Sequence, residues 1–242
     1  MLLVRTDFGV GIDRGGAGLL EVRHIIGIGR NYAEHAKEMG GDLPERPLVF
    51  TKNPASACLR GDPIRIPTVC RDPATGGPAQ VDFEAELAVV IGERCKDVPA
   101  DRALECVLGV CCANDVSARW WQKQGAGGQF CLGKSFDTFC PLGPRIVPLD
   151  EVGDVQGLIV TCCIDGETMQ RASTAQMIFP VAELIARLSA GTTLLPGTTI
   201  LTGTPSGVGH GRDPKRYLTP GETVTVSIGG IGELENPVED AE

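Results

Sequence analysis

Residues 81–91 are Val81-Asp82-Phe83-Glu84-Ala85-Glu86-Leu87-Ala88-Val89-Val90-Ile91, an apolar, β-branched stretch with three carboxylates in its first half. The apolar and β-branched residues and the following Gly92 predict a β-strand. Successive side chains of a strand point to opposite faces, so Asp82, Glu84 and Glu86 share one face, about 7 Å from one to the next. Carboxylates this close repel each other unless a cation lies between them. A solvent-facing strand with its polar side outward is the alternative that this stretch alone leaves open.

The bulk composition indicates an ordinary globular protein. The chain has 242 residues, of which 42% are hydrophobic and 22% charged, and this length buries a sizeable core in one domain. We expect residues 1–20 to form a short N-terminal arm or hairpin and residues 21–242 to form the main, catalytic domain. The net charge of −9 argues against nucleic acid and anionic membranes as partners. It leaves an anionic small substrate open, because the field at a site can oppose the net charge.

Ten cysteines are present, among them the adjacent pairs Cys111-Cys112 and Cys162-Cys163 in apolar runs. They show no C-x-x-C spacing, so a zinc ribbon or a thioredoxin-type motif is not supported. Buried, reduced thiols in a reducing compartment are the simplest interpretation. The first seven residues lack the layout of a signal peptide, and no apolar run is as long as a membrane span. We therefore expect a cytoplasmic protein, with an organellar matrix left open.

The remaining pattern predicts many strands and few helices. A short helix is expected after Asn31 as N-cap and ends before Gly40-Gly41, a second lies near Ala100–Val107, and an amphipathic helix begins at Pro180. Residues Arg71 to Gln80 are predicted to form a loop. Strands are expected at Val22–Ile28, Leu48–Thr51, Ile64–Ile66, Leu108–Ala113, Leu158–Ile164, Glu167–Gln170, Thr199–Thr202, Thr223–Ile228 and Ile231–Asn236. This content favours an α+β or mostly β single domain.

Asp115 follows the predicted buried strand 108–113, at a position from which a side chain can point into a cleft. Together with Glu84 and Glu86 it would form a site of hard oxygen ligands, which suits Mg²⁺ or Mn²⁺, with Ca²⁺ also compatible. Zinc is not favoured, because no His or Cys belongs to the set. Three carboxylates exceed the charge of one divalent ion by one unit, which makes Lys134 an attractive partner. A surface role for this lysine is the alternative.

His35 and Glu38 are three residues apart on the predicted short helix and therefore lie on one helix face. Glu38 would orient the imidazole of His35, which would then activate a water molecule or move a proton. A solvated helix with an incidental charge pair is the alternative. Further along, residues 202–209 (Thr-Gly-Thr-Pro-Ser-Gly-Val-Gly) follow a strand and offer backbone N–H groups that suit a substrate carboxylate.

Five segments, taken together and in this order, resemble the fumarylacetoacetate hydrolase family, from about Ile25 to Val238. The segments are Gly29-Arg30-Asn31-Tyr32-Ala33-Glu34-His35, Phe83-Glu84-Ala85-Glu86-Leu87, Asn114-Asp115-Val116-Ser117-Ala118-Arg119, Gly133-Lys134-Ser135-Phe136-Asp137 and Leu201-Thr202-Gly203-Thr204-Pro205.

The resemblance implies a β-rich roll domain, a homodimer, and Mg²⁺ or Mn²⁺ on a carboxylate triad. The implied metal ligands are Glu84, Glu86 and Asp115, and the implied catalytic residues are His35, Glu38 and Lys134. The implied substrate-binding residues are Arg30, Tyr32, Arg119, Gln122 and Thr204. One departure is visible, because similar sequences have Asp after the Ser-Ala-Arg motif, whereas here Trp120 and Trp121 follow Arg119. This change bears on how the far end of a substrate is recognised.

The expected function is therefore a metal-dependent cleavage of a C–C bond in a small anionic 2-oxo acid or diacid. The resemblance leaves acylpyruvate or fumarylpyruvate hydrolysis and oxaloacetate decarboxylation as candidates, with oxaloacetate keto–enol tautomerisation as the alternative, because all three pass through one enolate. A non-catalytic metal-binding member of the fold is less expected, since such a protein has no need of His35. A cysteine-nucleophile enzyme is disfavoured, because no cysteine lies in a nucleophile motif.

Overall fold

The computed structural model describes residues 1–71 and 79–241, so most of the predicted loop Arg71–Gln80 lies outside the described residues. The helices are α1 (Ala33–Glu38), α2 (Phe130–Lys134), α3 (Leu149–Val152) and α4 (Val181–Ser189). The strands are β1 (Leu2–Thr6), β2 (Gly9–Asp13), β3 (Leu19–Glu21), β4 (His24–Gly29), β5 (Leu48–Lys52), β6 (Ala57–Leu59), β7 (Ile64–Ile66), β8 (Val81–Asp82), β9 (Ala85–Ile91), β10 (Val107–Asn114), β11 (Ser117–Ala118), β12 (Cys140–Val147), β13 (Ile159–Ile164), β14 (Glu167–Ser173), β15 (Thr198–Leu201), β16 (Thr223–Ile228) and β17 (Gly232–Asp240).

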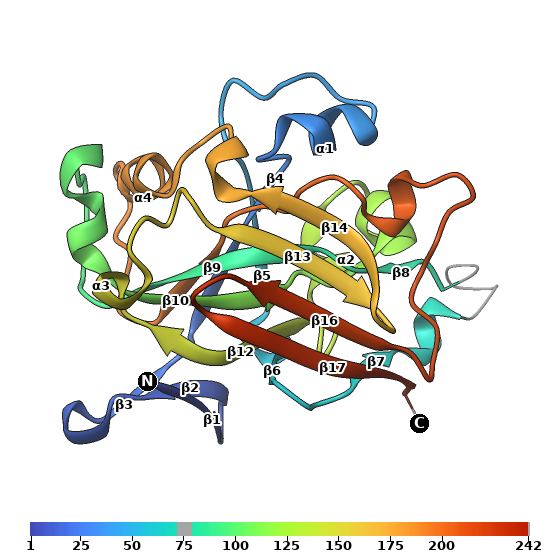
Figure 1. Ribbon diagram of the computed structural model, residues 1–242, viewed down its shortest axis with the longest axis horizontal. Helices are drawn as coiled ribbons and strands as arrows, with labels where there is room; N and C mark the ends of the chain where they lie inside the picture. Colours follow the sequence, from blue (N-terminus) through green and yellow to red (C-terminus); the bar gives the residue numbers. More distant parts are fainter. Residues whose placement is uncertain (72–78, 242) are drawn as a thin grey trace.

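Two large sheets face each other and enclose the main core (Figure 1). The larger sheet has the order β3-β2-β1-β12-β10-β9-β15-β4-β5, with β6 also paired to β12, and it contains both parallel and antiparallel pairs. The smaller sheet has the order β14-β13-β16-β17-β7. Short helices lie at the periphery, and α1 lies above the ends of β4 and β14 in this view (Figure 1). The fold is a β-rich α+β roll, as the sequence predicts.

Strand β9 lies in the interior of the larger sheet and is buried on both faces. Leu87, Val89 and Ile91 point into the core between the two sheets, whereas Ala88 and Val90 point into a second apolar cluster that includes side chains of β2. The carboxylates that precede and begin this strand are buried too. The solvent-facing alternative is therefore wrong.

The acidic stretch is not one continuous strand, in contrast to the prediction. Strand β8 pairs with β11 in a separate two-stranded sheet, and Phe83 and Glu84 separate it from β9. The N–H group of Glu84 donates to the side-chain Oδ1 of Asn114 at 3.0 Å instead of a strand partner. The break turns the backbone at the position where the carboxylates gather.

Several other elements differ from expectation. Asn31 does not cap α1, because its side chain binds the backbone of Phe179 and Thr202, and Tyr32 occupies the N-cap position. The segment Ala100–Cys106 is a 3-10 helix, and strand β12 has no counterpart in the prediction. Of the two forms left open for the N-terminal residues, the structure shows a hairpin, β1–β2, whose first strand pairs with β12.

All ten cysteines are free thiols, and most of them are buried. Burial raises the pKa of the Cys111 and Cys162 thiols far above the ordinary value, so they are not ionised at neutral pH. Cys131, on α2, is the exposed exception. Within residues 1–71 and 79–241, no helix has the length and apolar character to cross a lipid bilayer.

Candidate metal centre

The register between β9 and β10 places the three carboxylates together. Ala113 pairs with Glu86 and Asn114 with Ala85, so Asp115 lies opposite Glu84, whose carbonyl accepts the Asp115 N–H at 2.9 Å. One ligand oxygen from each of Glu84, Glu86 and Asp115 lies within 4.8 Å of the other two. All three residues are at least 95% buried. The predicted trio is therefore a real cluster in space.

The segment after β15 fixes the orientation of Glu86. The Gly203 N–H donates to Glu86 Oε2 at 2.6 Å, and the hydroxyl of Thr204 donates to the Ala85 carbonyl at 3.0 Å. Gly203 has φ +100, and a Cβ there would lie 2.6 Å from the Asn31 Cβ, so only glycine fits without a shift. This amide, expected to serve a substrate carboxylate, binds a carboxylate of the protein instead.

Buried cations surround the other two carboxylates. Lys134 Nζ contacts Glu84 Oε2 at 2.7 Å and Asp115 Oδ2 at 2.6 Å. Lys52, at the end of β5, contacts Asp115 Oδ1 at 2.5 Å. Arg119 contacts Glu84 Oε1 at 2.6 Å. Lys134 thus lies beside the carboxylates of the triad, as expected, and it is buried, so it is not a surface lysine.

Asp82 joins this network from the other side of Arg119. Its carboxylate receives the guanidinium at 2.7 Å and the N–H groups of Gly209 and His210 at 2.7 and 2.9 Å. Arg119, expected to bind substrate, therefore bridges two carboxylates of the protein. Its remaining Nη1 donates to Gln122 Oε1 at 3.1 Å.

The charges explain why a divalent cation fits this site. Four buried carboxylates face three buried cations. Within the described residues, Glu86 is the carboxylate of the triad that contacts a backbone amide and no cation. Burial and the neighbouring Asp115 and Glu84 raise the pKa of Glu86 well above its ordinary value. For Glu84, burial opposes ionisation, but Lys134 and Arg119 outweigh it and lower the pKa far below the ordinary range. An all-oxygen donor set with one uncompensated carboxylate suits Mg²⁺ or Mn²⁺.

His35 and Glu38 form the expected dyad on helix α1. His35 Nδ1 lies 3.1 Å from Glu38 Oε2, and Glu38 Oε1 accepts the Gly207 N–H at 2.9 Å. Because a carboxylate accepts from Nδ1, a neutral His35 carries its proton there and keeps a lone pair on Nε2. His35 is 5% exposed, so the alternative of a solvated helix with an incidental charge pair is wrong.

A narrow cavity of about 50 Å³ connects these groups. Its lining includes His35, Glu84, Glu86, Arg119 and Lys134. Of the residues expected to bind substrate, Arg30, Gln122 and Thr204 also line it. Tyr32 does not lie among the described lining residues; it lines a neighbouring recess, and its buried hydroxyl has no hydrogen-bond partner in the described structure. The binding roles of these residues remain predictions.

Three residues at the site, Lys52, Asp82 and Lys123, were given no role from the sequence. Lys52 ends an apolar strand in the same way as Asp115, and that position is the signal that could have revealed it. Asp82 lies on the same face of the predicted strand as Glu84, but no role was expected for it. Trp120 and Trp121 are in edge-to-face contact with each other, and Trp121 also packs against Phe136; neither indole is among the described side chains that line the cavity. Lys123, the next residue after Gln122, lines the cavity instead.

Comparisons with known proteins agree with this architecture. The family model described as "Fumarylacetoacetate (FAA) hydrolase C-terminal" matches residues 24–239. A Burkholderia cenocepacia protein named "Putative hydrolase" is 47% identical over 96% of this chain and 79% of its own length.

Two solved structures extend the comparison. The fumarylacetoacetate hydrolase of Exiguobacterium antarcticum superposes with a TM-score of 0.80 at 41% identity, over 93% of this chain and 79% of that one. The 5-carboxymethyl-2-hydroxymuconate delta-isomerase of Mycobacterium smegmatis gives 0.78 at 38% identity, over 93% and 82%. With its buried acidic triad and its roll of two sheets, the chain belongs to the fumarylacetoacetate hydrolase family of enzymes.

Proposed function

We propose that this protein is a divalent-metal-dependent enzyme that cleaves a C–C bond in a small 2-oxo acid carrying a second carbonyl or carboxylate group. Hydrolysis of an acylpyruvate such as fumarylpyruvate, or decarboxylation of oxaloacetate, are the concrete reactions. The observation that carries the proposal is that Glu84 and Glu86 of the clustered carboxylate triad line one narrow cavity together with His35, whose imidazole is oriented by Glu38. A protein that only binds a metal has no use for an oriented imidazole beside it.

The residues that would hold the ion are Glu84, Glu86 and Asp115. A divalent ion bound there supplies Lewis-acid polarisation of a substrate that offers a carboxylate and a 2-oxo oxygen. The ammonium group of Lys134 lies against Glu84 and Asp115, so it adds fixed positive charge beside the oxygen on which negative charge develops. Because Lys52 also contacts Asp115, the orientation of that carboxylate is set before a substrate arrives.

His35 would be the general base. Its Nε2 lone pair accepts a proton from a water molecule that attacks the distal carbonyl, and Glu38 stabilises the imidazolium that forms. The backbone amide of Gly207 holds Glu38 in place. Helix α1 lies over the ends of the strands (Figure 1) and would limit the access of bulk water to the cavity.

Keto–enol isomerisation is the second candidate, because one solved relative is named as an isomerase. This reaction requires only proton transfer at C3, which the same imidazole can perform. Isomerisation releases neither pyruvate nor CO₂, so product analysis separates the two candidates.

The test is a substrate panel assayed with Mg²⁺, with Mn²⁺ and with a chelator. Acetylpyruvate, fumarylpyruvate and oxaloacetate are followed by ultraviolet absorbance, pyruvate release and CO₂ release. We expect pyruvate or CO₂ release that depends on the metal. If no member of the panel reacts with either metal, the proposal is wrong.

His35→Ala is expected to lower the rate of hydrolysis by roughly 10²–10⁴-fold, the usual contribution of a positioned base, and to leave metal affinity unchanged. His24, which is exposed at the start of β4, provides the matched control, His24→Ala, with an unchanged rate. Steady-state kinetics and calorimetric titration of Mn²⁺ measure the two quantities. An unaltered rate in His35→Ala would favour decarboxylation or isomerisation without this base.

We also propose a homodimer in a reducing, cytoplasm-like compartment. Leu48 and Val49 on the edge strand β5 and Leu132 on α2 leave apolar side chains exposed, which suits a contact with a second copy. Ten free thiols suit a reducing compartment. Light scattering after gel filtration gives the mass of the particle, and a monomer at micromolar concentration would contradict the dimer.

A further inference from the structure

A recess of about 420 Å³ adjoins the catalytic cavity. Met39 and Lys123 line both spaces, so Lys123 stands at the boundary between them. The outer recess is also lined by His210 and Lys215, and Arg30 lines the inner cavity. A substrate whose reacting end lies at the triad would point its other end toward this boundary.

His210 fixes the position of the Lys123 ammonium group. Lys123 Nζ lies 2.8 Å from His210 Nε2, and His210 Nδ1 lies 2.7 Å from the Tyr217 hydroxyl. An ammonium group only donates, so His210 Nε2 must be the acceptor, and the neutral imidazole carries its proton on Nδ1 and donates it to Tyr217. Burial and the neighbouring Lys123, Arg119 and Lys215 lower the pKa of His210 to about 4, in agreement with this tautomer.

The pair is anchored to the catalytic site through the backbone. The His210 N–H donates to Asp82 Oδ2 at 2.9 Å, the same oxygen accepts from Arg119, and Arg119 contacts Glu84. Asp82 is fully buried. The recess therefore keeps a fixed distance from the metal ligands.

The cations at this boundary have no carboxylate of their own. In the described part of the chain, no Asp or Glu oxygen lies within 4.0 Å of Lys123, Lys215 or Arg30. Glu38 and Asp213 also line the recess. Both oxygens of Glu38 are used by His35 and Gly207, and, among the residues that the structure describes, Asp213 forms no ion pair with these cations. The whole chain carries a net charge of −9, so this gathering of cations runs against the global charge.

We infer that Lys123, held in place by His210, binds a second carboxylate at the far end of the substrate, and that this enzyme selects dianionic 2-oxo acids over those with an uncharged tail. The inference rests on the proposed function for the reacting end. Lys123 would contact the substrate, and His210 is a positioning residue that acts through it. Arg30 and Lys215 contribute long-range attraction to the same anion.

The test compares two acylpyruvates that differ in the tail, fumarylpyruvate with a carboxylate and acetylpyruvate without one, in the presence of Mg²⁺. Wild-type enzyme is expected to prefer fumarylpyruvate in kcat/KM. Lys123→Gln is expected to lower kcat/KM for fumarylpyruvate about tenfold or more, the usual effect of losing a hydrogen bond to a charged group, chiefly through KM. With acetylpyruvate the two enzymes should agree.

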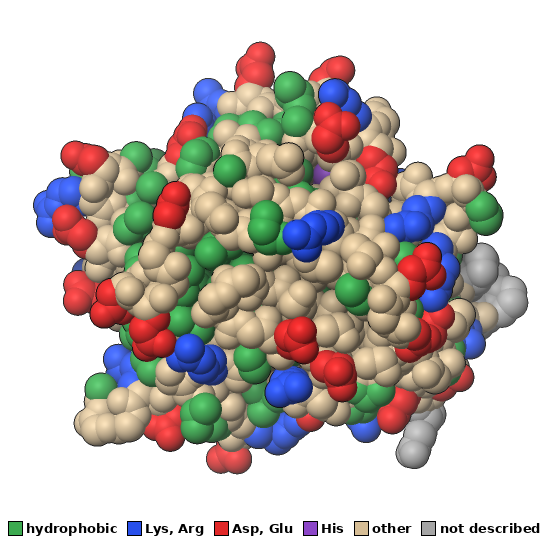
Figure 2. Space-filling model, viewed as in Figure 1, with side chains coloured by type: hydrophobic (Ala, Val, Ile, Leu, Met, Phe, Trp, Pro, Cys, Tyr) green, Lys and Arg blue, Asp and Glu red, His purple; other side chains and the backbone are tan. Residues whose placement is uncertain are grey.

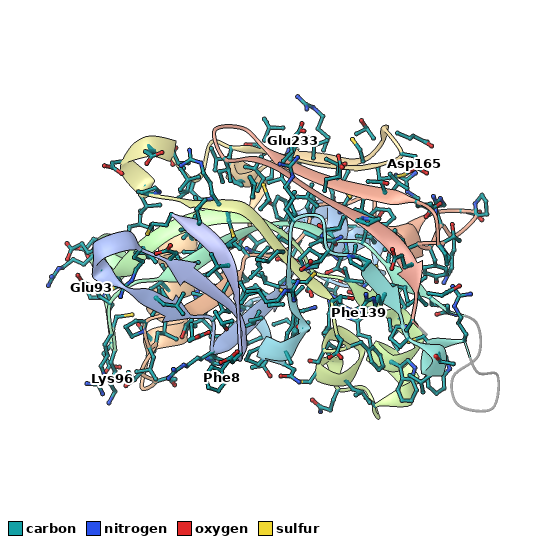
Figure 3. All side chains as sticks on the ribbon, turned by 90° about the horizontal axis from the view of Figure 1, so that it is seen from below. Phe8, Glu93, Lys96, Phe139, Asp165 and Glu233 are labelled. Atoms are coloured by element: carbon teal, nitrogen blue, oxygen red, sulfur yellow. The ribbon has the colours of Figure 1, made fainter. Side chains whose placement is uncertain are left out.

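The matched control is Lys96→Gln, which makes the same charge change at an exposed site. Figure 3 shows Lys96 far from Phe139, whose carbonyl accepts the N–H of Val116, next to the metal ligand Asp115. We expect no change for either substrate. An equal loss on both substrates in Lys123→Gln, or no loss on fumarylpyruvate, would overturn the inference.

The role of His210 is tested with two variants. His210→Phe removes the acceptor for Lys123 and should raise KM for fumarylpyruvate only, whereas His210→Gln keeps an acceptor oxygen and should restore most of the affinity. Effects on kcat for both substrates would instead indicate a general structural role.

Binding measurements distinguish a failure of the proposed reaction from a failure of the proposed carboxylate site. If wild-type enzyme turns over neither acid, binding of the same two compounds is measured by calorimetry. A preference for fumarylpyruvate that Lys123→Gln abolishes would support the carboxylate site in the absence of the reaction. Equal binding of the two acids to the wild-type protein would rule it out.

Discussion

The three carboxylates of the triad have different partners, although the sequence gives them similar surroundings. Glu84 contacts Lys134 and Arg119, Asp115 contacts two lysines, and Glu86 contacts a backbone amide. Residue type, the strand alternation of Glu84 and Glu86, and the position of Asp115 after a predicted strand were enough to predict the trio. Lys52 was missed although it ends an apolar strand, because its contact with Asp115 joins residues 63 positions apart and the strand end alone does not identify that partner. The dyad could be predicted because His35 and Glu38 are three residues apart on one helix.

His210 gives a prediction about stability and pH. Its pKa is lowered in the folded protein from 6.5 to about 4, chiefly by burial, whereas the unfolded chain protonates near 6.5. As pH falls through this window the unfolded state binds the proton first, so the folded protein loses stability. Urea unfolding at several pH values should show a steeper loss for wild-type protein than for His210→Gln. Parallel curves would contradict the lowered pKa.

At the scale of elements, the segment that follows β15 does more than connect strands. Its amides hold Glu86 of the triad and Glu38 of the dyad, and those of Gly209 and His210 hold Asp82. The sequence predicted the strand before it and an anion-binding character for its amides. It did not predict that the anions are the protein's own, because the partners come from α1, β8 and β9, far away in the chain.

Gly203→Ala tests this segment. The added Cβ would meet the Asn31 Cβ at 2.6 Å, and the backbone has φ +100, so we expect a loss of roughly 1–3 kcal/mol in the free energy of unfolding. Metal affinity should fall as well, since the Gly203 amide orients Glu86. Gly16→Ala is the control, because its Cβ meets nothing within 4 Å and should change stability by less than about 0.5 kcal/mol. Urea unfolding measures the stability of both variants, and equal stabilities would contradict the expected clash at Gly203.

The break between β8 and β9 shows the limit of reading single elements. Periodicity alone favours one strand from Val81 to Ile91, because each residue in it is compatible with a strand. The strand is interrupted where the side chain of Asn114 accepts the hydrogen bond from the Glu84 N–H. Side-chain competition for a backbone donor depends on the neighbouring strand, so it is visible only once the pairing of β9 with β10 is known.

On the scale of the whole molecule, the sequence predicted the β-rich α+β class, because alternation, turn residues and few helical segments all agreed. It did not predict that β9 is buried on both faces, on one side by the core between the two sheets and on the other by an apolar cluster that includes β2. Acidic and basic side chains are interspersed over the face shown in Figure 2, which carries the smaller sheet at its centre. On this face, therefore, the basic side chains do not form a broad basic surface.

A bound metal should stabilise the whole fold. At a concentration one hundred times its Kd, a ligand adds about 2.7 kcal/mol, and each kcal/mol raises the Tm of a chain of this size by roughly 2–4 °C. We therefore expect Mg²⁺ or Mn²⁺ to raise the Tm by about 5 °C or more in a calorimetric scan.

Glu86→Gln provides the comparison for that scan. The variant should lose most of the shift, because a neutral amide replaces a charged ligand. Its metal-free Tm should be no lower than that of the wild-type protein, since burial and the neighbouring carboxylates already disfavour the charged form of Glu86. A full shift in the variant would remove Glu86 from the ligand set.

The exposed Cys131 on α2 offers a labelling site for following the enzyme during turnover. It lies three residues before Lys134 on one short helix, whereas most other thiols are shielded inside the protein. A maleimide fluorophore would therefore attach preferentially at this position without any engineered cysteine. Its emission would report in real time how the lysine-bearing helix responds when metal and substrate arrive, in stopped-flow experiments on the unmodified sequence.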